Sequence, residues 1–295
     1  MATEVRPHRS EDATVWCVNP QVYGKILHAG TTCRAPTLKV MKNEFDAYAD
    51  FYDKWNDNFI SDIPLWLEYA RKCGSPVLEL CSGTGRISLP IAREGIEITG
   101  LDISEKMLDK AREKLAKEPE DVKKRVCLLQ GDMRNFHLKK EFNFIFVPFN
   151  SFLVLISSEE QNSCLRSAYK HLSSQGRLVI SMFNADLSRA EGVLRSEGDI
   201  LENYPRAGDT TEIFSYQFFD KPKQIIKVRI FVDSTKESGE LFRKTIDLKM
   251  RYFFEDEFER ILFNNGFETE DVFGNYDKVP FKDDSPFMIF VAKKR

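Results

Sequence analysis

The segment from residue 76 to residue 102 constrains the fold more than any other part of the chain. Pro76-Val-Leu-Glu-Leu80 is a short apolar run of strand-forming residues, and the glycine-containing loop Cys81-Ser-Gly-Thr-Gly85 follows it. Apolar residues then recur at helical spacing as far as Ala92, and Gly95-Ile-Glu-Ile-Thr-Gly-Leu-Asp102 predicts a second strand. A strand, a tight loop, a helix and another strand make a βαβ unit, which implies a parallel sheet.

The alternation of strands and helices continues on both sides of this unit. Two amphipathic helices are predicted before it, one from Asn43 and one after Pro64, because apolar residues recur at helical spacing in both. Ser104 is expected to cap a helix after Asp102. Further strands are predicted at 126–130, 142–147 and 177–183, with a helix at 158–171. Repeated strands separated by helices favour a parallel sheet covered on both faces.

The pattern changes after about residue 186. Three stretches rich in strand formers follow, and turn residues Pro222 and Gly239 separate them, which predicts an antiparallel β flap with strands at 212–219, 225–232 and 241–252. A last helix at 255–264 ends at Gly266, and two strands near 268–273 and 286–292 close the chain. We expect four parts: an N-terminal extension or arm, the α/β core, the inserted flap, and a C-terminal helix with closing strands of the core, at 1–42, 43–185, 186–253 and 254–295.

Composition excludes several functional classes. The 295 residues carry 43 Lys plus Arg against 46 Asp plus Glu, so no excess of positive charge favours nucleic acid as a partner. The charged N-terminus does not resemble a signal peptide, and no apolar run is long enough for a membrane span. Six cysteines without a Cys-x-x-Cys pair indicate neither a disulfide framework nor a metal site. We therefore expect a cytoplasmic protein without membrane association.

Polar residues and glycines gather where the predicted parallel strands end. Glu79 lies near the end of the first strand, Gly83 and Gly85 form the turn after it, Asp102 ends the second strand, and Gly131-Asp-Met133 follows the third. Open α/β sheets bind ligands outside these carboxyl ends. The spacing from the glycine loop to Asp102 is close to the roughly 20 residues at which an acidic side chain meets ribose hydroxyls. An adenosine compound is therefore the expected ligand.

Two details favour a cationic ligand over a nicotinamide dinucleotide. A carboxylate at Glu79 would repel a pyrophosphate but suits a sulfonium and an ammonium group. Ser88 stands where dinucleotide-binding proteins keep a third glycine, and the chain has no Tyr-x-x-x-Lys pair. A nicotinamide-dependent oxidoreductase remains the alternative at this level.

Four motifs in order resemble those of class I S-adenosylmethionine-dependent methyltransferases: Val77-Leu-Glu-Leu-Cys-Ser-Gly-Thr-Gly-Arg-Ile87, Leu101-Asp-Ile-Ser-Glu-Lys-Met-Leu108, Gly131-Asp-Met-Arg134 and Gly176-Arg-Leu-Val-Ile180. The likeness covers about 43–185 and resumes at Asn265-Gly-Phe267. It implies a Rossmann-like, seven-stranded, mostly parallel sheet. The flap is similar to that of bacterial small-molecule methyltransferases, including those that methylate amino sugars. Cys81 departs from the motif, which often has glycine there, and implies tighter packing beside the loop.

The resemblance assigns cofactor contacts residue by residue. It implies that Gly83 and Gly85 lie beside the amino-acid part of S-adenosylmethionine and that Asp102 binds the ribose hydroxyls. Glu79 would shape the loop and attract the ammonium end. On the adenine side, Ile103 and Met107 would flank the ring, Asp132 would accept from its amino group and the Met133 amide would donate to a ring nitrogen; the reaction product would be S-adenosyl-L-homocysteine.

The acceptor side is less defined. Tyr48, Tyr52 and Trp55 share a helical face, and an aromatic ring stabilises a sulfonium by cation–π attraction, so Tyr52 is the preferred contact. Phe149 and Asn150 follow the fourth strand, where the methyl group should emerge, and the segment lacks the Pro-Pro-Tyr motif of nucleic-acid amino methylases. Arg251 and Tyr252, at the exit of the flap, and Asn184 are further candidate substrate contacts. The four histidines, at 8, 28, 137 and 171, are expected on the surface or in the arm.

We expect methyl transfer to a small-molecule acceptor, through nitrogen, by in-line displacement that depends on positioning. The oxidoreductase and a non-catalytic binding module for the same cofactor are the alternatives. The flap and the N-terminal arm either enclose the substrate or pair two subunits as a homodimer.

Overall fold

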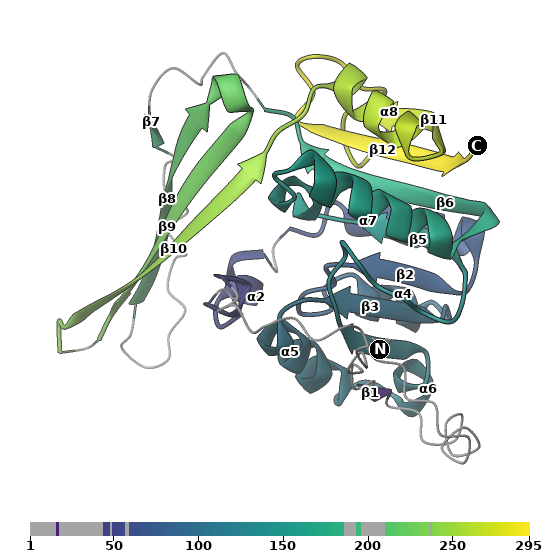
Figure 1. The fold of residues 1–295 in the computed structure, drawn as a ribbon. Coiled ribbons are helices and arrows are strands. Elements are labelled where there is room, and N and C mark those ends of the chain that lie inside the picture. Colours follow the sequence, from purple (N-terminus) through teal and green to yellow (C-terminus); the bar gives the residue numbers. More distant parts are fainter. Residues whose placement is uncertain are drawn as a thin grey trace, which may run out of the picture.

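The computed structural model describes residues 16–17, 44–47, 49–56, 59–185, 193–195, 210–236 and 238–295. Its main sheet has the order β1-β4-β3-β2-β5-β6-β12-β11 (Figure 1). The strands are β1 (Trp16–Cys17), β2 (Val77–Leu80), β3 (Ile98–Asp102), β4 (Val126–Gln130), β5 (Phe142–Val147), β6 (Leu172–Phe183), β11 (Phe267–Phe273) and β12 (Phe287–Lys294). Strands β4, β3, β2, β5 and β6 are parallel, whereas β12 is antiparallel to both of its neighbours. This arrangement confirms the expected Rossmann-like, mostly parallel sheet.

Helices cover both faces of the sheet. One face packs against α3 (Ile63–Cys73), α4 (Ser88–Arg93), α5 (Glu105–Leu115) and α6 (Glu120–Lys123). The other face packs against the short 3-10 helix η3 (Ser151–Val154), α7 (Ser158–His171) and α8 (Glu255–Asn264). Because side chains alternate along a strand, β5 supplies Phe144 and Phe146 to the first face and Ile145 and Val147 to the second. Each fully buried aromatic side chain contributes roughly 1.5–3 kcal/mol.

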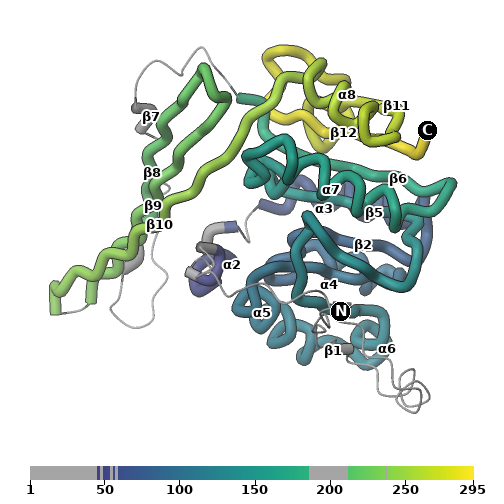
Figure 2. The backbone as a smooth tube through the Cα atoms, in the orientation of Figure 1, coloured from purple at the N-terminus to yellow at the C-terminus, as the bar shows by residue number. Residues whose placement is uncertain are grey.

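A separate antiparallel sheet corresponds to the predicted flap. Its strand order is β10-β9-β8-β7, with bounds β7 (Val193–Arg195), β8 (Thr210–Asp220), β9 (Ile225–Thr235) and β10 (Leu241–Arg251). The 3-10 helix η5 (Lys221–Lys223) joins β8 to β9, where Pro222 predicts a turn. The sheet extends away from the α/β core in Figure 2. One of its faces is buried and includes Ile226, Ile230 and Ile246.

The N-terminal elements differ from the prediction. In place of one amphipathic helix from Asn43, the structure has the 3-10 helix η2 (Glu44–Ala47), a turn, and the short helix α2 (Tyr52–Asn56). The interruption has a tertiary cause, because Phe51 is buried in the hydrophobic cluster of the flap sheet. Strand β1, which pairs antiparallel with β4, is unexpected in a segment without strand periodicity.

The remaining elements follow the sequence pattern closely. Strands β4 and β5 and helices α7 and α8 have the predicted bounds. Ser104 caps α5, since its hydroxyl accepts a hydrogen bond from the Met107 amide at 3.2 Å. Gly266 is left-handed after α8, with φ of 89°, as the helix-ending pattern predicts. Among the helices of the described residues, none is both long enough and apolar enough to cross a membrane.

Candidate active site

The loop after β2 has an unusual backbone. Cys81, Gly83 and Gly85 all have positive φ, at 61°, 54° and 77°. A side chain disfavours this conformation, so the left-handed backbone explains why glycine would suit position 81. The Cys81 Sγ atom lies 3.4 Å from the Met133 Sδ atom, so its side chain packs beside the loop. A Cβ atom added at Gly83 would meet nothing within 4 Å, which leaves open space next to this turn.

Asp102 lies at the end of β3 directly beside this loop. Its side chain accepts hydrogen bonds from the Gly83 amide at 2.7 Å and from the Ser104 amide at 2.8 Å. Asp102 is 7 % exposed, and burial raises the pKa of its carboxyl to about 6. Within the described residues, backbone amides rather than Lys or Arg side chains are its hydrogen-bond donors. A carboxylate held in this way keeps acceptor positions for ligand hydroxyls.

The loop after β4 lies next to Asp102. The Gly131 amide donates to the Asp102 carbonyl at 2.9 Å, so Gly131-Asp-Met133 lies on the same rim. The Met133 amide has no hydrogen-bond acceptor among the residues that the structure describes. Asp132 itself forms an ion pair with Arg134, with the closest N–O distance at 2.6 Å. The rim therefore has a carboxylate and an amide donor on adjacent residues, and their contact with an adenine stays a prediction.

Glu79 lies below the rim. Its side chain is 2 % exposed and accepts a hydrogen bond from the Ser88 hydroxyl. Burial is the main reason that the pKa of Glu79 is raised to about 8; the Ser88 hydrogen bond and Arg86 oppose this shift, and the nearby Asp102 adds to it. Glu79 thus supports the glycine loop and the start of α4 from within the core. Ser88, which occupies the position of the third glycine in dinucleotide-binding proteins, supplies the hydroxyl for this contact.

Tyr52 reaches the rim from α2. Burial raises the pKa of its hydroxyl well above the ordinary value; Arg86 opposes this shift, and the carboxyls of Glu79 and Asp102 add to it. Asp46 ties η2 to the core, because it accepts from the Ser104 hydroxyl at 2.6 Å, and Asp53 ties α2 to the core, because it accepts from Thr84. Tyr48 and the side chain of Trp55 lie outside the described residues, so the shared aromatic face is not tested.

The backbone after β5 turns sharply at the expected place. Phe149 and Asn150 are both left-handed, with φ of 54° and 66°. The Phe149 amide donates to the Ser181 hydroxyl at 3.1 Å, and Asn150 Oδ1 accepts from the Phe183 amide at 2.6 Å. These contacts fix the end of β5 against β6. The Asn150 oxygen therefore has a structural partner, and its contact with an acceptor stays a prediction.

The other adenine-side residues lie at the start of α5. Ile103 is half-buried, and its carbonyl accepts from the Gln130 side chain at 3.3 Å. Met107 is 3 % exposed, so most of its side chain packs in the interior. Ile103 follows Asp102 directly and Met107 lies in the first turn of α5, and the contact of both with a purine ring stays a prediction.

The two candidates at the exit of the flap have structural contacts. Arg251 pairs with Glu257 at 2.5 Å and donates to Gln161 at 3.0 Å, which joins β10 to α8 and α7. Tyr252 is 2 % exposed and belongs to the cluster of the flap sheet. Asn184 donates to the carbonyls of Asp283 and Ser285. Substrate contact by these three residues stays a prediction.

Sequence reasoning missed a buried ion pair beneath the rim. Arg86 donates to both oxygens of Asp62 at 2.7 Å and 2.6 Å, and Trp66 Nε1 donates to the same carboxylate at 3.1 Å. The Arg86 guanidinium also lies 5.2 Å from the ring centroid of Phe149. In the sequence Asp62 has the position of a helix cap before α3, but its side chain makes no capping bond. The sequence therefore suggests a helix cap at Asp62, whereas in the structure this carboxylate pairs with Arg86.

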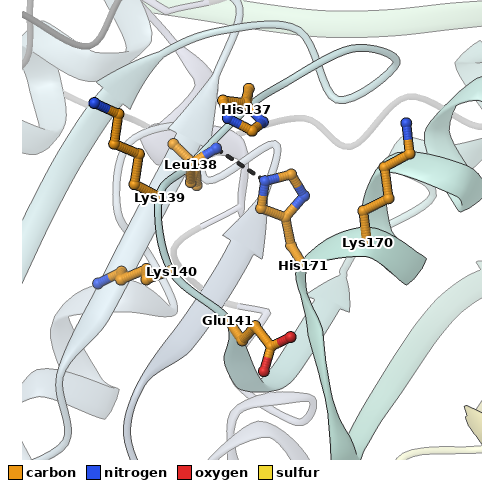
Figure 3. Close-up of a pocket in the computed structure, with 7 residues that line it drawn as sticks. All are labelled: His137, Leu138, Lys139, Lys140, Glu141, Lys170 and His171. Atoms are coloured by element: carbon orange, nitrogen blue, oxygen red, sulfur yellow. Dashed lines mark hydrogen bonds between the residues drawn. The ribbon is translucent and has the colours of Figure 1, made fainter.

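A shallow hollow of about 280 Å³ lies at the opposite end of the sheet, lined by residues 137–141, Lys170 and His171 (Figure 3). These segments precede β5 and β6, so the hollow is remote from the carboxyl-end rim. The prediction that His171 is a surface residue is wrong, since it is 4 % exposed. Its ring accepts from the Leu138 amide at 2.9 Å and contacts the Ser167 carbonyl, and burial lowers its pKa. His137 lines the hollow, whereas His8 and His28 lie outside the described residues.

Among the described residues, no group of three or more His, Cys, Asp or Glu side chains is arranged to hold a metal ion.

Comparisons with known proteins agree with this geometry. Residues 77–176 match the family model described as a methyltransferase domain. The glycine/sarcosine N-methyltransferase of Aphanothece halophytica is 24 % identical over 266 residues, which cover 86 % of this chain and 91 % of that protein. A dTDP-3-amino-3,4,6-trideoxy-alpha-D-glucopyranose N,N-dimethyltransferase of Streptomyces venezuelae is 33 % identical over 106 residues, or 36 % of this chain and 41 % of that one.

The fold has solved counterparts. The structure of the CcbJ methyltransferase from Streptomyces caelestis superposes with a TM-score of 0.70 at 24 % identity, over 85 % of this chain and 97 % of that chain. The matched segment of 77–176 contains β2 to β5, and hence the glycine loop, Asp102 and Asp132. The chain therefore contains a methyltransferase domain, its relatives include small-molecule N-methyltransferases, and it has the fold of S-adenosylmethionine-dependent methyltransferases.

Proposed function

We propose that the enzyme transfers the methyl group to an amino nitrogen of a small molecule that binds between the flap sheet and the strand-end rim. This proposal rests on a contact that links the flap sheet to the strand-end rim. Lys244 of β10 lies 3.5 Å from the Asp50 carboxylate and over the ring of Phe51. The next residues form α2, which carries Tyr52 to the rim. We therefore place the acceptor between the flap sheet and the rim, where a small molecule is expected to bind more readily than a polymer.

Known relatives support nitrogen as the acceptor atom. The two curated relatives described above act on glycine or sarcosine and on an amino sugar, and both carry the name of N-methyltransferases.

The residues on the rim fit the cofactor. When bound, S-adenosylmethionine supplies a methyl group on a positively charged sulfur. We assign the amino-acid part to the loop with Gly83 and Gly85, shaped from below by Glu79, and the ribose hydroxyls to Asp102. The buried Asp102 carboxylate and the open space at Gly83 support this assignment, as does the Met133 amide, which has no acceptor within the described part of the chain. The adenine would lie among Ile103, Met107, Asp132 and Met133.

On the acceptor side we propose contacts from Tyr52, Phe149 and Asn150, with Arg251 and Tyr252 at the end of the flap. In-line displacement needs two reactants held in close alignment, and alignment alone supplies a large share of the rate. Aromatic rings exclude water, and those of Tyr52 and Phe149 would also favour the positive charge near the sulfur. An ammonium acceptor must lose a proton before attack. Glu79 is buried against Ser88, so water or another carboxylate is the better proton acceptor.

Assembly and location are part of the proposal. We propose a cytoplasmic enzyme that binds no nucleic acid and uses residues 186–253 as one inserted unit. Two copies would pair through the flap or through the N-terminal arm. The flap offers an edge strand, β10, with Leu241 and Phe242 exposed by 55 % and 47 %. Sedimentation of the full chain and of a Leu241→Lys/Phe242→Lys variant tests the flap interface.

The test of the function is methyl transfer from isotopically labelled S-adenosylmethionine to a panel of acceptors. The panel contains glycine, sarcosine, nucleotide-linked amino sugars, matched alcohols and phenols, and DNA. We expect labelled product only from amines, and mass spectrometry of fragments locates the methyl group on nitrogen. Product from an alcohol or from DNA would contradict the proposal. Tight cofactor binding without transfer to any acceptor would favour a non-catalytic binding module.

A further inference from the structure

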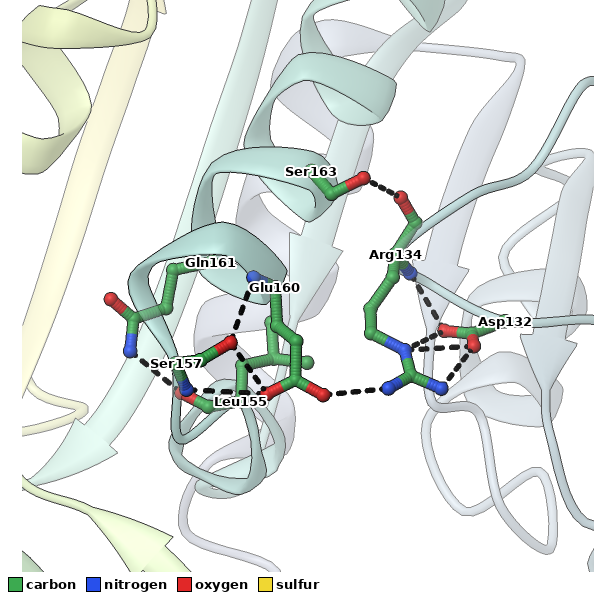
Figure 4. Close-up of polar contacts among 7 residues, drawn as sticks. All are labelled: Asp132, Arg134, Leu155, Ser157, Glu160, Gln161 and Ser163. Carbon is green, nitrogen blue, oxygen red and sulfur yellow. Dashed lines mark hydrogen bonds and ion pairs between the residues drawn. The ribbon is translucent and has the colours of Figure 1, made fainter. Parts of the chain in front are cut away.

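Arg134 donates hydrogen bonds to both oxygens of the Asp132 carboxylate (Figure 4). The Arg134 backbone amide donates to Oδ1 at 2.8 Å. Its Nε atom lies 3.0 Å from Oδ1 and 2.8 Å from Oδ2, and Nη2 donates to Oδ2 at 2.6 Å. Three hydrogens of one residue thus bind one carboxylate, and the Nε hydrogen is shared between the two oxygens.

These contacts limit the number of further hydrogen bonds that the Asp132 carboxylate can accept. A carboxylate has about four acceptor positions, and Arg134 fills about three of them. The Asp132 side chain is 12 % exposed, so only a small part of it reaches the rim. One acceptor position therefore remains for a donor on the ligand. Because the guanidinium holds the carboxylate in place, it also sets the direction of the remaining acceptor position.

Helix α7 in turn holds Arg134. Nη1 donates to Glu160 Oε1 at 2.7 Å, and Glu160 belongs to the capping box of α7, where its other oxygen accepts from the Ser157 amide at 3.2 Å. The Arg134 carbonyl accepts from the hydroxyls of Ser163 at 2.8 Å and Ser167 at 3.1 Å. Both ends of Arg134 are thus attached to one rigid helix.

We propose that Arg134, oriented by Glu160, is a positioning residue that makes the enzyme selective for a 6-aminopurine cofactor. It holds the Asp132 carboxylate in one orientation, with one acceptor position directed at the rim. An amino group at purine position 6 donates to that position, whereas a 6-oxo group presents an acceptor to an acceptor. This inference rests on the proposed assignment of the adenine to Asp132.

The geometry explains why a guanidinium is needed. A lysine ammonium would supply a positive charge but not the planar fork that meets both oxygens and also reaches Glu160. Loss of the fork would let the Asp132 carboxylate rotate, and its remaining acceptor position would no longer be fixed.

The experiment measures dissociation constants by calorimetry for two probes, S-adenosylhomocysteine and S-inosylhomocysteine. The proteins are wild type, Arg134→Lys, Arg134→Gln, Glu160→Gln and Ser163→Ala. Ser163→Ala is the matched control, because it loosens the attachment of the same loop to α7 without touching the guanidinium. Thermal midpoints of the unliganded proteins verify that each variant is folded.

We expect wild type to prefer the adenosyl probe strongly. Both Arg134 variants should lose roughly tenfold affinity for it, as for one charged hydrogen bond, with little change for the inosyl probe. Glu160→Gln should give a smaller loss of the same kind, and Ser163→Ala should keep the preference. In turnover, the Arg134 variants should raise KM for S-adenosylmethionine and leave kcat nearly unchanged.

Two results would overturn the inference. One is an equal loss of both probes in the Arg134 variants, which would indicate a merely structural residue. The other is full retention of the preference in Arg134→Gln. Both are distinct from failure of the proposed function, in which wild type would bind S-adenosylhomocysteine but methylate no amine.

Discussion

The Thr84 hydroxyl donates to Asp53 Oδ1 at 2.5 Å and thereby ties helix α2 to the glycine loop. The same carboxylate oxygen lies 2.7 Å from the Lys114 ammonium of α5. Helix α2 is only five residues long, and a helix of this length depends on tertiary contacts. The position of Tyr52, at the start of α2, therefore depends on Asp53.

Removing the charge at Asp53 should weaken cofactor binding. Asp53→Asn loses the ion pair with Lys114 and loosens α2, so we expect roughly three- to tenfold weaker binding of S-adenosylmethionine. The matched control is Asp121→Asn on α6, which removes an exposed carboxylate that pairs with Arg125. Calorimetry of both variants checks the prediction, and an equal effect of the two substitutions would contradict it.

The ring of Tyr52 should discriminate between the methyl donor and its product. Cation–π attraction acts on the sulfonium but not on the neutral thioether of S-adenosylhomocysteine. Tyr52→Leu should weaken binding of the donor by roughly 2- to 30-fold relative to Tyr52→Phe, with little difference for the product. Isothermal titration with both ligands provides the measurement. Equal losses for donor and product in Tyr52→Leu would show that the ring acts through packing only.

Burial of Glu79 should make folding stability depend on pH. Its folded-state pKa of about 8 exceeds the ordinary 4.5, so the folded protein holds this proton more tightly than the unfolded chain. The resulting stabilisation is complete below about pH 4.5 and is lost as pH rises through 8. Asp102, with a pKa raised to about 6, adds a smaller contribution of the same sign.

The wild type should therefore lose roughly 2–4 kcal/mol of unfolding free energy between about pH 5 and 8.5 from this carboxyl. Glu79→Gln keeps a neutral side chain of the same size, so its decrease over that range should be markedly smaller. Urea unfolding at several pH values measures both. Identical pH profiles for wild type and variant would contradict the assignment.

The ion pair at the end of the flap should contribute more to stability than a similar pair on the flap surface. The side chains of Arg251 and Glu257 are 16 % and 21 % exposed, whereas those of Arg229 and Asp247 are 58 % and 61 % exposed. Arg251→Met leaves Glu257 and Gln161 without their shared partner and should cost about 1–3 kcal/mol. Arg229→Met should cost about 0–1 kcal/mol. Comparable losses in urea unfolding would indicate that Arg251 does not join the flap to α7 and α8.

Local patterns predicted most of the sheet because strand and helix periods are strong in the core. Strands β4 and β5 are largely buried apolar runs, and helices α7 and α8 each bury one face, so their bounds follow from residue spacing. The segment from Glu44 to Asn56 was harder, because Phe51 is buried against the flap rather than against its own helical neighbours. Long-range packing there overrides local propensity.

The rim could be predicted as a set of residues but not as a network. Glycines and carboxylates at strand ends indicate a ligand site, and the structure brings Gly83, Asp102 and Gly131 into hydrogen-bonded succession. Contacts between distant segments, such as Arg86 with Asp62 and Arg134 with Glu160, leave no spacing signal in the sequence. Their partners lie 24 and 26 positions apart. Only the fold places them together.

Calorimetric titration of wild type and Asp102→Asn with S-adenosylmethionine tests the central claim most directly. Asp102→Asn preserves shape but removes the acceptor charge at the ribose position, so its affinity should fall by roughly ten- to a hundredfold, while the wild type binds one equivalent. Absence of binding by the wild type, or equal affinity of the two proteins, would contradict the account.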